Sequence, residues 1–137
     1  MLGASREEPM SVRSYRDLMV WKKGMDLAAA VYRLTRQMPK QEEYRFSGQM
    51  IRAATSIPAN IAEGHGRGTR KDYGHFVSIA KGSLAELETF LLLVRELDLA
   101  TPAATDPVLS QADEVGRMLT ALRARLVTRS LPLEPSP

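Results

Sequence analysis

The sequence contains no cysteine among its 137 residues. This absence excludes disulfides, thiolate zinc sites, iron–sulfur clusters and cysteine nucleophiles. No run of 18 or more apolar residues occurs, which excludes a transmembrane helix, and the longest apolar run, residues 90–94, is followed directly by Arg95. The first residues include Glu7 and Glu8 and no apolar stretch, so a secretory signal is not expected. We therefore expect a cytoplasmic protein that makes no membrane contact.

Charged residues show only a small excess of one sign. The chain has 19 Lys and Arg residues against 16 Asp and Glu, for a formal net charge of +3. This excess is compatible with an anionic partner and also with an ordinary solvated surface. Hydrophobic residues make up 44% of the chain and charged residues 26%, which is typical of a folded globular protein and excludes a disordered one.

The pattern along the chain divides it into three parts. Residues 1–13 show no periodicity and contain Gly3 and Pro9, so we expect a flexible N-terminal arm. Residues 130–137 include three prolines, which predicts a flexible C-terminal tail. Residues 14–129 remain as one domain.

Apolar residues within this domain recur every three to four positions, which predicts helices and no strand. Long helices with short connections are typical of an all-α, antiparallel up-down four-helix bundle. Ser14 with Asp17 and Thr69 with Asp72 resemble capping boxes, and Asp106 with Pro107 resembles a helix start. The expected helices are about 15–37, 43–63, 70–97 and 106–128.

Two of the helices have wide apolar surfaces. The first helix has two adjacent stripes that together form one wide apolar face, and the third is apolar around much of its circumference. A small bundle needs only one buried stripe per helix, so the surplus of the third helix favours a homo-oligomer, although the same residues could simply widen the core. The first helix's stripes are Leu18, Trp21, Met25, Ala28 and Tyr32, then Leu27, Val31, Leu34 and Met38; the surplus of the third helix is Phe90, Leu92, Leu93 and Leu99.

The segment around Pro58 is unusual for a helix. Proline removes one amide and clashes with the preceding turn, which predicts a kink. Asn60 and Glu63 could satisfy the freed backbone groups, and Gly64 is placed to end the helix in the left-handed conformation. We interpret Pro58, Asn60, Glu63 and Gly64 as a structural motif.

Basic residues concentrate in two regions. Arg67, Arg70 and Lys71 surround the start of the third helix, where backbone amides also favour an anion. The fourth helix has arginines and no acid after Val115, and its arginines suit contacts with phosphates. Favourable interaction with the helix dipole explains part of this second pattern. The arginines of the fourth helix are Arg117, Arg123, Arg125 and Arg129.

Catalytic and metal-binding patterns are scarce. Neither His65 nor His75 has a partner at metal-ligand spacing, and the glycine-rich segment 64–68 follows a predicted helix rather than the strand of a dinucleotide site. Arg70 and His75 match a loose spacing found in some helical ribonucleases, with the arginine on phosphate and the histidine as general base. We predict no metal, no cofactor and no catalytic residue, and keep the ribonuclease as an alternative.

Several motifs resemble those of a known family, the four-helix-bundle proteins encoded in 23S rRNA intervening sequences. The opening Tyr15-Arg16-Asp17-Leu18, followed by Val20-Trp21-Lys22, resembles the start of these proteins. The most specific shared segment is Ser56-Ile57-Pro58-Ala59-Asn60-Ile61-Ala62-Glu63-Gly64. The resemblance covers about residues 14–128, and the family is related to the accessory variability proteins of diversity-generating retroelements.

This resemblance implies a four-helix bundle that assembles as a ring-like homopentamer. The retroelement relatives bind nucleic acid and a reverse transcriptase through basic surface residues, and no member is known as an enzyme. Our leading hypothesis is a non-enzymatic oligomeric bundle that binds DNA or RNA, structured RNA above all, through phosphates. The alternatives are a protein-interaction scaffold, for example one that docks a reverse transcriptase, and the ribonuclease.

Overall fold

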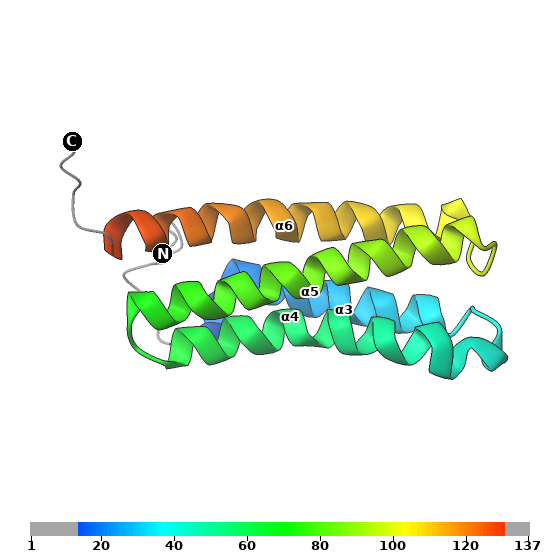
Figure 1. The fold of residues 1–137 in the computed structure, drawn as a ribbon, viewed down its shortest axis with the longest axis horizontal. Coiled ribbons are helices and arrows are strands. Elements are labelled where there is room, and N and C mark those ends of the chain that lie inside the picture. The colour runs from blue at the N-terminus through cyan, green and yellow to red at the C-terminus, as the bar shows by residue number, and fades with distance from the viewer. Residues whose placement is uncertain (1–13, 131–137) are drawn as a thin grey trace, which may run out of the picture.

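Four long helices lie side by side, and each runs opposite to the one before it (Figure 1). The computed structural model describes residues 14–130, and within that range it contains no strand. This confirms the predicted all-α, antiparallel four-helix bundle. The expected arm 1–13 and nearly all of the expected tail lie outside the described residues. The helices are α3 (Met19–Thr35), α4 (Gly48–Gly66), α5 (Arg70–Glu96) and α6 (Pro102–Ser130).

The hydrophobic core lies where the four helices face one another. Each helix contributes large side chains that are almost inaccessible to solvent, and each of them stabilises the fold by about 1.5–3 kcal/mol through burial. On α6 the core-facing residues recur four and three positions apart, and all are buried except Leu122, which is half-buried; they are Val108, Ala112, Val115, Leu119, Leu122 and Leu126. The largest fully buried side chains include Leu27 and Val31 of α3, Met50, Ile57 and Ile61 of α4, Leu87 and Leu91 of α5, and Val115 and Leu119 of α6.

The first helix begins later than the sequence suggests. The Ser14 hydroxyl accepts a hydrogen bond from the Arg16 amide at 3.1 Å, which caps a short 3-10 turn, η1 (Tyr15–Asp17). Leu18 then has an extended backbone, with φ −78° and ψ 127°, and α3 begins at Met19. The predicted capping box on an α-helix starting at Tyr15 is therefore wrong, because a tighter turn uses the same serine.

One of the two apolar stripes on α3 lies in the core, and the other packs against the core only in part, through Leu18, Trp21 and Ala28. Leu27, Val31 and Leu34 are buried. Met25 and Tyr32, of the other stripe, are 46% and 49% exposed. The outward face of α3 therefore carries large apolar side chains that the bundle itself does not cover.

Two short segments connect α3 to α4. Lys40–Glu42 forms a 3-10 turn, η2, and Glu43–Ser47 forms a π-helical turn, η3. The predicted start of the second helix at residue 43 therefore corresponds to this π turn. Regular α-helical geometry begins at Gly48.

Helix α4 continues through Pro58 without interruption. Pro58 is buried, and a β-carbon added at Gly24 would lie 3.5 Å from its β-carbon, so the proline packs closely against α3. The Asn60 side-chain amide donates to the Ser56 carbonyl at 2.7 Å. Glu63 forms an ion pair with Arg67 instead of satisfying backbone groups near the proline.

The sequence placed the end of this helix too early. Gly64 lies inside α4, and the left-handed residue is Gly68, with φ +89°. A β-carbon at Gly64 would come within 2.7 Å of the Phe76 β-carbon and 3.1 Å of Tyr73 Cδ1. Gly64 therefore allows α4 and α5 to approach closely, and its predicted role as a helix terminator is wrong.

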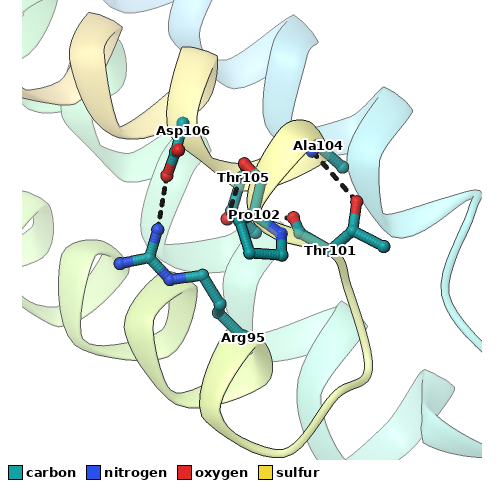
Figure 2. Close-up of polar contacts among 6 residues, drawn as sticks. All are labelled: Arg95, Thr101, Pro102, Ala104, Thr105 and Asp106. Atoms are coloured by element: carbon teal, nitrogen blue, oxygen red, sulfur yellow. Dashed lines mark hydrogen bonds and ion pairs between the residues drawn. The ribbon is translucent and has the colours of Figure 1, made fainter.

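The connection between α5 and α6 also differs from the prediction (Figure 2). The Thr101 hydroxyl accepts a hydrogen bond from the Ala104 amide at 3.1 Å, so α6 begins at Pro102 rather than after Asp106. Asp106 instead pairs with Arg95 of α5, and Pro107 lies within the helix. Thr101-Pro102 and Asp106-Pro107 lie five residues apart in the sequence, and the threonine of the first pair caps the helix. The predicted cap at the start of α5 is confirmed, because the Thr69 hydroxyl accepts from the Asp72 amide at 3.1 Å.

Candidate nucleic-acid interface

Cations that are far apart in the sequence share one end of the bundle. The end of α4, the start of α5 and the end of α6 lie together (Figure 1). Arg129 lies in the last turn of α6, but its side chain is outside the described part of the structure. We call the shared cluster the basic end, and it consists of Arg67, Arg70, Lys71, Arg123 and Arg125.

Arg67 is held in place by two neighbours. Its guanidinium contacts the Glu63 carboxylate at 3.0 Å, and the Cζ atom lies 4.8 Å from the centroid of the Phe76 ring. Arg67 and Glu63 are each about half exposed. An ion pair of this kind contributes only about 0.2–1 kcal/mol, so a phosphate could compete for the arginine.

Arg70 and Lys71 are the most available cations of the basic end. Both side chains are exposed, and neither forms an ion pair or side-chain hydrogen bond with any other described residue. They occupy the first turn of α5, where the positive end of the helix dipole opposes them. An anion bound there would relieve both unfavourable interactions at once.

The arginines of α6 lie beside the first turns of α5. The Arg123 Nε donates to the Ser78 hydroxyl. Arg125 lies close enough to Tyr73 to lower its pKa, but burial of the phenol is the larger effect and leaves the pKa of Tyr73 raised overall. The Tyr73 hydroxyl is buried with no hydrogen-bond partner among the described residues. This hydroxyl therefore faces the protein interior and is not available to donate a hydrogen bond to a phosphate.

Arg117 does not belong to the basic end. It lies in the middle of α6, where it forms an ion pair with Asp113 and lines a groove between α5 and α6. Glu88 lines the same groove, and burial raises its pKa, with a further contribution from the negative charge of Asp113. The predicted set of seven cations is thus divided into a terminal cluster, one separate residue and one undescribed side chain.

Comparison with known proteins identifies the family. The sequence pattern of the 23S rRNA-intervening sequence proteins matches residues 16–121. The chain belongs to this family. No curated protein matches it. A crystal structure from Bacteroides thetaiotaomicron, of a protein of unknown function in the S23 ribosomal protein family, is similar with a TM-score of 0.70 and 25% identity, over 77% of this chain and 98% of that one.

Family membership confirms the resemblance that the motifs indicated. The matched residues include Arg67, Arg70 and Lys71, but the match ends at residue 121, before Arg123 and Arg125. The α6 part of the basic end therefore lies beyond the region by which the family is identified. The relation to the retroelement proteins stays a prediction.

Two further cations near the basic end were not singled out from the sequence. Arg16 directly precedes Asp17 of η1, and Lys22 lies in the first turn of α3, which starts at the same end of the bundle (Figure 1). Both side chains are exposed. Their place near the basic end could have been inferred from the predicted topology. An antiparallel bundle places the starts of the first and third helices beside the ends of the second and fourth.

Arg70 and His75, the two residues of the ribonuclease alternative, lie five residues apart on α5. The exposed His75 ring is packed edge-on against Phe76, with the centroids 5.2 Å apart. Within residues 14–130, no cluster of three or more potential metal ligands occurs. The same range contains no helix that is long and apolar enough to cross a membrane.

Proposed function

We propose that this protein is a non-enzymatic, oligomeric bundle that binds nucleic acid through phosphate contacts at its basic end, with structured RNA as the favoured ligand. The observation that carries this proposal is the gathering of five cations from three chain segments, four of which form no ion pair with a described residue. The turns of α4 and α5 that carry these cations contain only two acidic residues, Glu63 and Asp72. The family's name, which refers to 23S rRNA, is consistent with an RNA ligand.

Recognition at this end would follow the backbone rather than the bases. Phosphate contacts position a protein on nucleic acid but read no sequence. Single-strand binders instead offer exposed aromatic rings on which bases stack. Here Tyr73 and Phe76 are half-buried between α4 and α5 and contact Gly64. We therefore expect weak sequence preference.

Oligomerisation is supported by apolar side chains that the bundle leaves exposed. Leu92 and Leu93 of α5 are 49% and 39% exposed, and Met25 and Tyr32 of α3 are similarly accessible. An assembly would cover these residues and would place several basic ends in one particle. The combined charge of several copies would offset the small net charge of a single chain.

Salt-dependent RNA binding tests the proposal. Fluorescence anisotropy with a structured RNA should show an affinity that falls about tenfold or more between low and physiological salt, because counterions are released from each contacted phosphate. Affinity that does not change with salt would contradict it. If no binding occurs at low salt, the proposal is wrong, and the exposed apolar residues would favour a scaffold for a protein partner instead.

A matched pair of variants locates the contact. Arg70→Glu with Lys71→Glu should weaken binding about tenfold or more. The control, Lys40→Glu with Arg52→Glu, changes the net charge equally at exposed positions away from the basic end and should have little effect. Equal losses in the two variants would indicate nonspecific attraction. Any RNA cleavage in a preparation should persist in His75→Ala, and cleavage that disappears in it would support the ribonuclease.

A further inference from the structure

Thr69 lies in an open connection between α4 and α5. Its side chain is exposed, and its backbone is extended, with φ −122° and ψ 152°. Its hydroxyl accepts a hydrogen bond from the Asp72 amide at 3.1 Å, which leaves the hydroxyl proton unused in that bond. A β-carbon added at Gly66 or Gly68 would meet no atom within 4 Å, so the space beside the connection is also open. Another macromolecule can therefore reach this hydroxyl without displacing other parts of the bundle.

The residues around Thr69 are basic on both sides. Arg67 lies two positions before it, Arg70 follows it directly, and Lys71 comes next. Protein kinases select substrates by charge pattern, and a kinase with acidic pockets beside its active site favours arginines that flank the acceptor. The sequence around Thr69 thus fits a kinase of this basophilic class.

Only one other serine or threonine in the chain has an arginine two positions before it and a basic residue directly after it. This residue is Thr35, between Arg33 and Arg36. Thr35 is only 8% exposed, and its hydroxyl donates to the Tyr32 carbonyl at 2.7 Å. The sequence offers both threonines to a kinase, but the folded bundle leaves only Thr69 accessible.

We propose that Thr69 is a phosphorylation site and that its phosphorylation closes the basic end to nucleic acid; the second part rests on the proposed function. The co-reactant is ATP, bound to a basophilic serine/threonine kinase. Thr69 Oγ1 forms a bond to the γ-phosphorus, and the bond from that phosphorus to the oxygen that bridges it to the β-phosphorus breaks. ADP leaves with the electron pair of that bond, and the hydroxyl proton passes to the catalytic aspartate of the kinase.

The new phosphate would lie among cations that have few partners. It carries a charge of about −1.5 to −2 at neutral pH and three strong acceptor oxygens. Arg70 and Lys71 form no ion pair with a described residue, so both are available to it. Arg67 has an ion pair with an acid of α4, but both partners are about half exposed and such a pair is easily exchanged. Asp72 is the only acid in the first turn of α5, so attraction outweighs repulsion around the phosphate.

A phosphate on Thr69 would use the same donors that contact RNA in the proposed function. Because it is covalently attached beside them, its effective concentration is high, and an RNA phosphate would have to displace it. Each cation that is neutralised in this way removes one phosphate contact and the counterion release that accompanies it. The unmodified protein is therefore open to RNA, and the phosphorylated protein is closed.

A kinase assay tests whether the folded chain is modified at Thr69. The kinase is a purified basophilic serine/threonine kinase, chosen because it phosphorylates synthetic peptides of residues 30–40 and 64–74 equally well. With ATP and the whole folded protein, mass spectrometry should find phosphate on Thr69 and none on Thr35. Thr69→Val should abolish this uptake, and Thr35→Val should leave it unchanged. A folded protein that takes up no phosphate at Thr69, or takes it up equally at Thr35, would overturn the inference.

Protein made with phosphothreonine at position 69 during translation tests the effect on RNA binding. Fluorescence anisotropy at low salt should show an affinity about tenfold or more below that of the unmodified protein. The control has phosphothreonine at position 55, which adds the same charge at an exposed position in the middle of α4. It should bind RNA nearly as well as the unmodified protein. Equal losses for the two modified proteins would show that only the net charge matters and would contradict closure.

Thermal unfolding gives a second measurement that does not depend on RNA. Phosphothreonine at position 69 should raise the midpoint by about 4 °C at low salt, and by less at high salt, because salt screens the new ion pairs. A midpoint that is not raised would mean that the cations do not pair with the phosphate, which would overturn the inference whatever the RNA result.

The outcomes separate this inference from the proposed function. If the unmodified protein binds RNA and phosphothreonine at position 69 does not weaken binding, the inference is wrong and the phosphate contacts still stand. If the unmodified protein does not bind RNA, the proposed function is wrong. In that case uptake at Thr69 and a raised midpoint would still support the phosphorylation site, and closure to nucleic acid would be rejected with the proposed function.

Discussion

Gly64 of α4 and Phe76 of α5 are so close that a β-carbon added at the glycine would lie 2.7 Å from the phenylalanine β-carbon. The same added atom would lie 3.3 Å from the Tyr73 carbonyl oxygen. Neither neighbour is the flexible tip of a long side chain. The two helices can therefore cross here only because position 64 has no side chain.

Replacing this glycine should destabilise the fold. We expect Gly64→Ala to lower the free energy of unfolding by about 1–3 kcal/mol, the usual cost of overpacking a core, as measured by urea denaturation. Gly66→Ala is the matched control, because nothing lies within 4 Å of a β-carbon added there. The control should be neutral or slightly stabilising, since alanine favours helix over glycine. Equal stability of the two variants would show that α4 and α5 have room to separate.

The start of α6 can be tested by comparing its two candidate caps. Thr101→Ala removes the hydroxyl that accepts from the Ala104 amide and should cost about 1 kcal/mol. Asp106→Ala removes the ion pair with Arg95. The side chains of Arg95 and Asp106 are 33% and 62% exposed, so this loss should lower the free energy of unfolding by less. Thermal unfolding of both variants measures the difference. A larger loss for Asp106→Ala would mean that the helix starts where the sequence pattern suggested.

The two exposed leucines of α5 should differ in their effect on assembly. Leu92 lies four residues after Glu88 and seven after Ala85, so it shares the side of α5 that lines the groove. Leu93 follows Glu86 by seven residues and belongs to another side of the helix. We expect Leu92→Glu to dissociate the assembly in sedimentation experiments and Leu93→Glu to leave it intact. The opposite result would place the contact on the α4–α5 face.

The carboxyl of Glu88 should make the isolated bundle less stable as pH rises. Burial, and then the charge of Asp113, raise the pKa of Glu88 above its usual value of 4.5. The folded state therefore holds this proton more tightly than the unfolded state does, and its contribution to stability is lost as pH rises through the folded pKa.

The Glu88→Gln substitution isolates this effect. Glu88→Gln should flatten the pH dependence of the unfolding free energy just above pH 4.5. Glu86→Gln, at a neighbouring exposed position, provides the control. If Glu88→Gln leaves the pH dependence of the unfolding free energy unchanged, the groove does not destabilise the charged form of Glu88.

Periodicity was sufficient to predict the four helices, because one buried stripe per helix is a property of the local sequence, and the short connections predicted their antiparallel order. The ends of the helices were predicted less well. Gly64 fits the pattern of a helix terminator, and only the position of α5 shows that it serves close packing. Asp106 with Pro107 and Thr101 with Pro102 are equally good start signals, and the choice between them depends on the length of the bundle.

The candidate site was predicted only in part, because some of its residues are far apart in the sequence. Arg67, Arg70 and Lys71 are adjacent in the sequence, so their proximity was evident. Their grouping with Arg123 and Arg125 depends on the lengths of α5 and α6, which together set where α6 ends. Arg117 matches the others in composition, but its ion pair with Asp113 and its place in the α5–α6 groove separate it from them. Such a distinction needs three-dimensional distances.

The antiparallel order also determines where fused tags would lie. Helix α3 starts and helix α6 ends at the same end of the bundle as the cation cluster (Figure 1). A tag fused directly at residue 14 or residue 130 would therefore lie beside that cluster and could mask it or add charge to it. A circular permutant that links residue 130 to residue 14 and opens the chain between α3 and α4 would move both new ends to the opposite end of the molecule. Immobilised through such an end, the protein would present its cations freely to the solution.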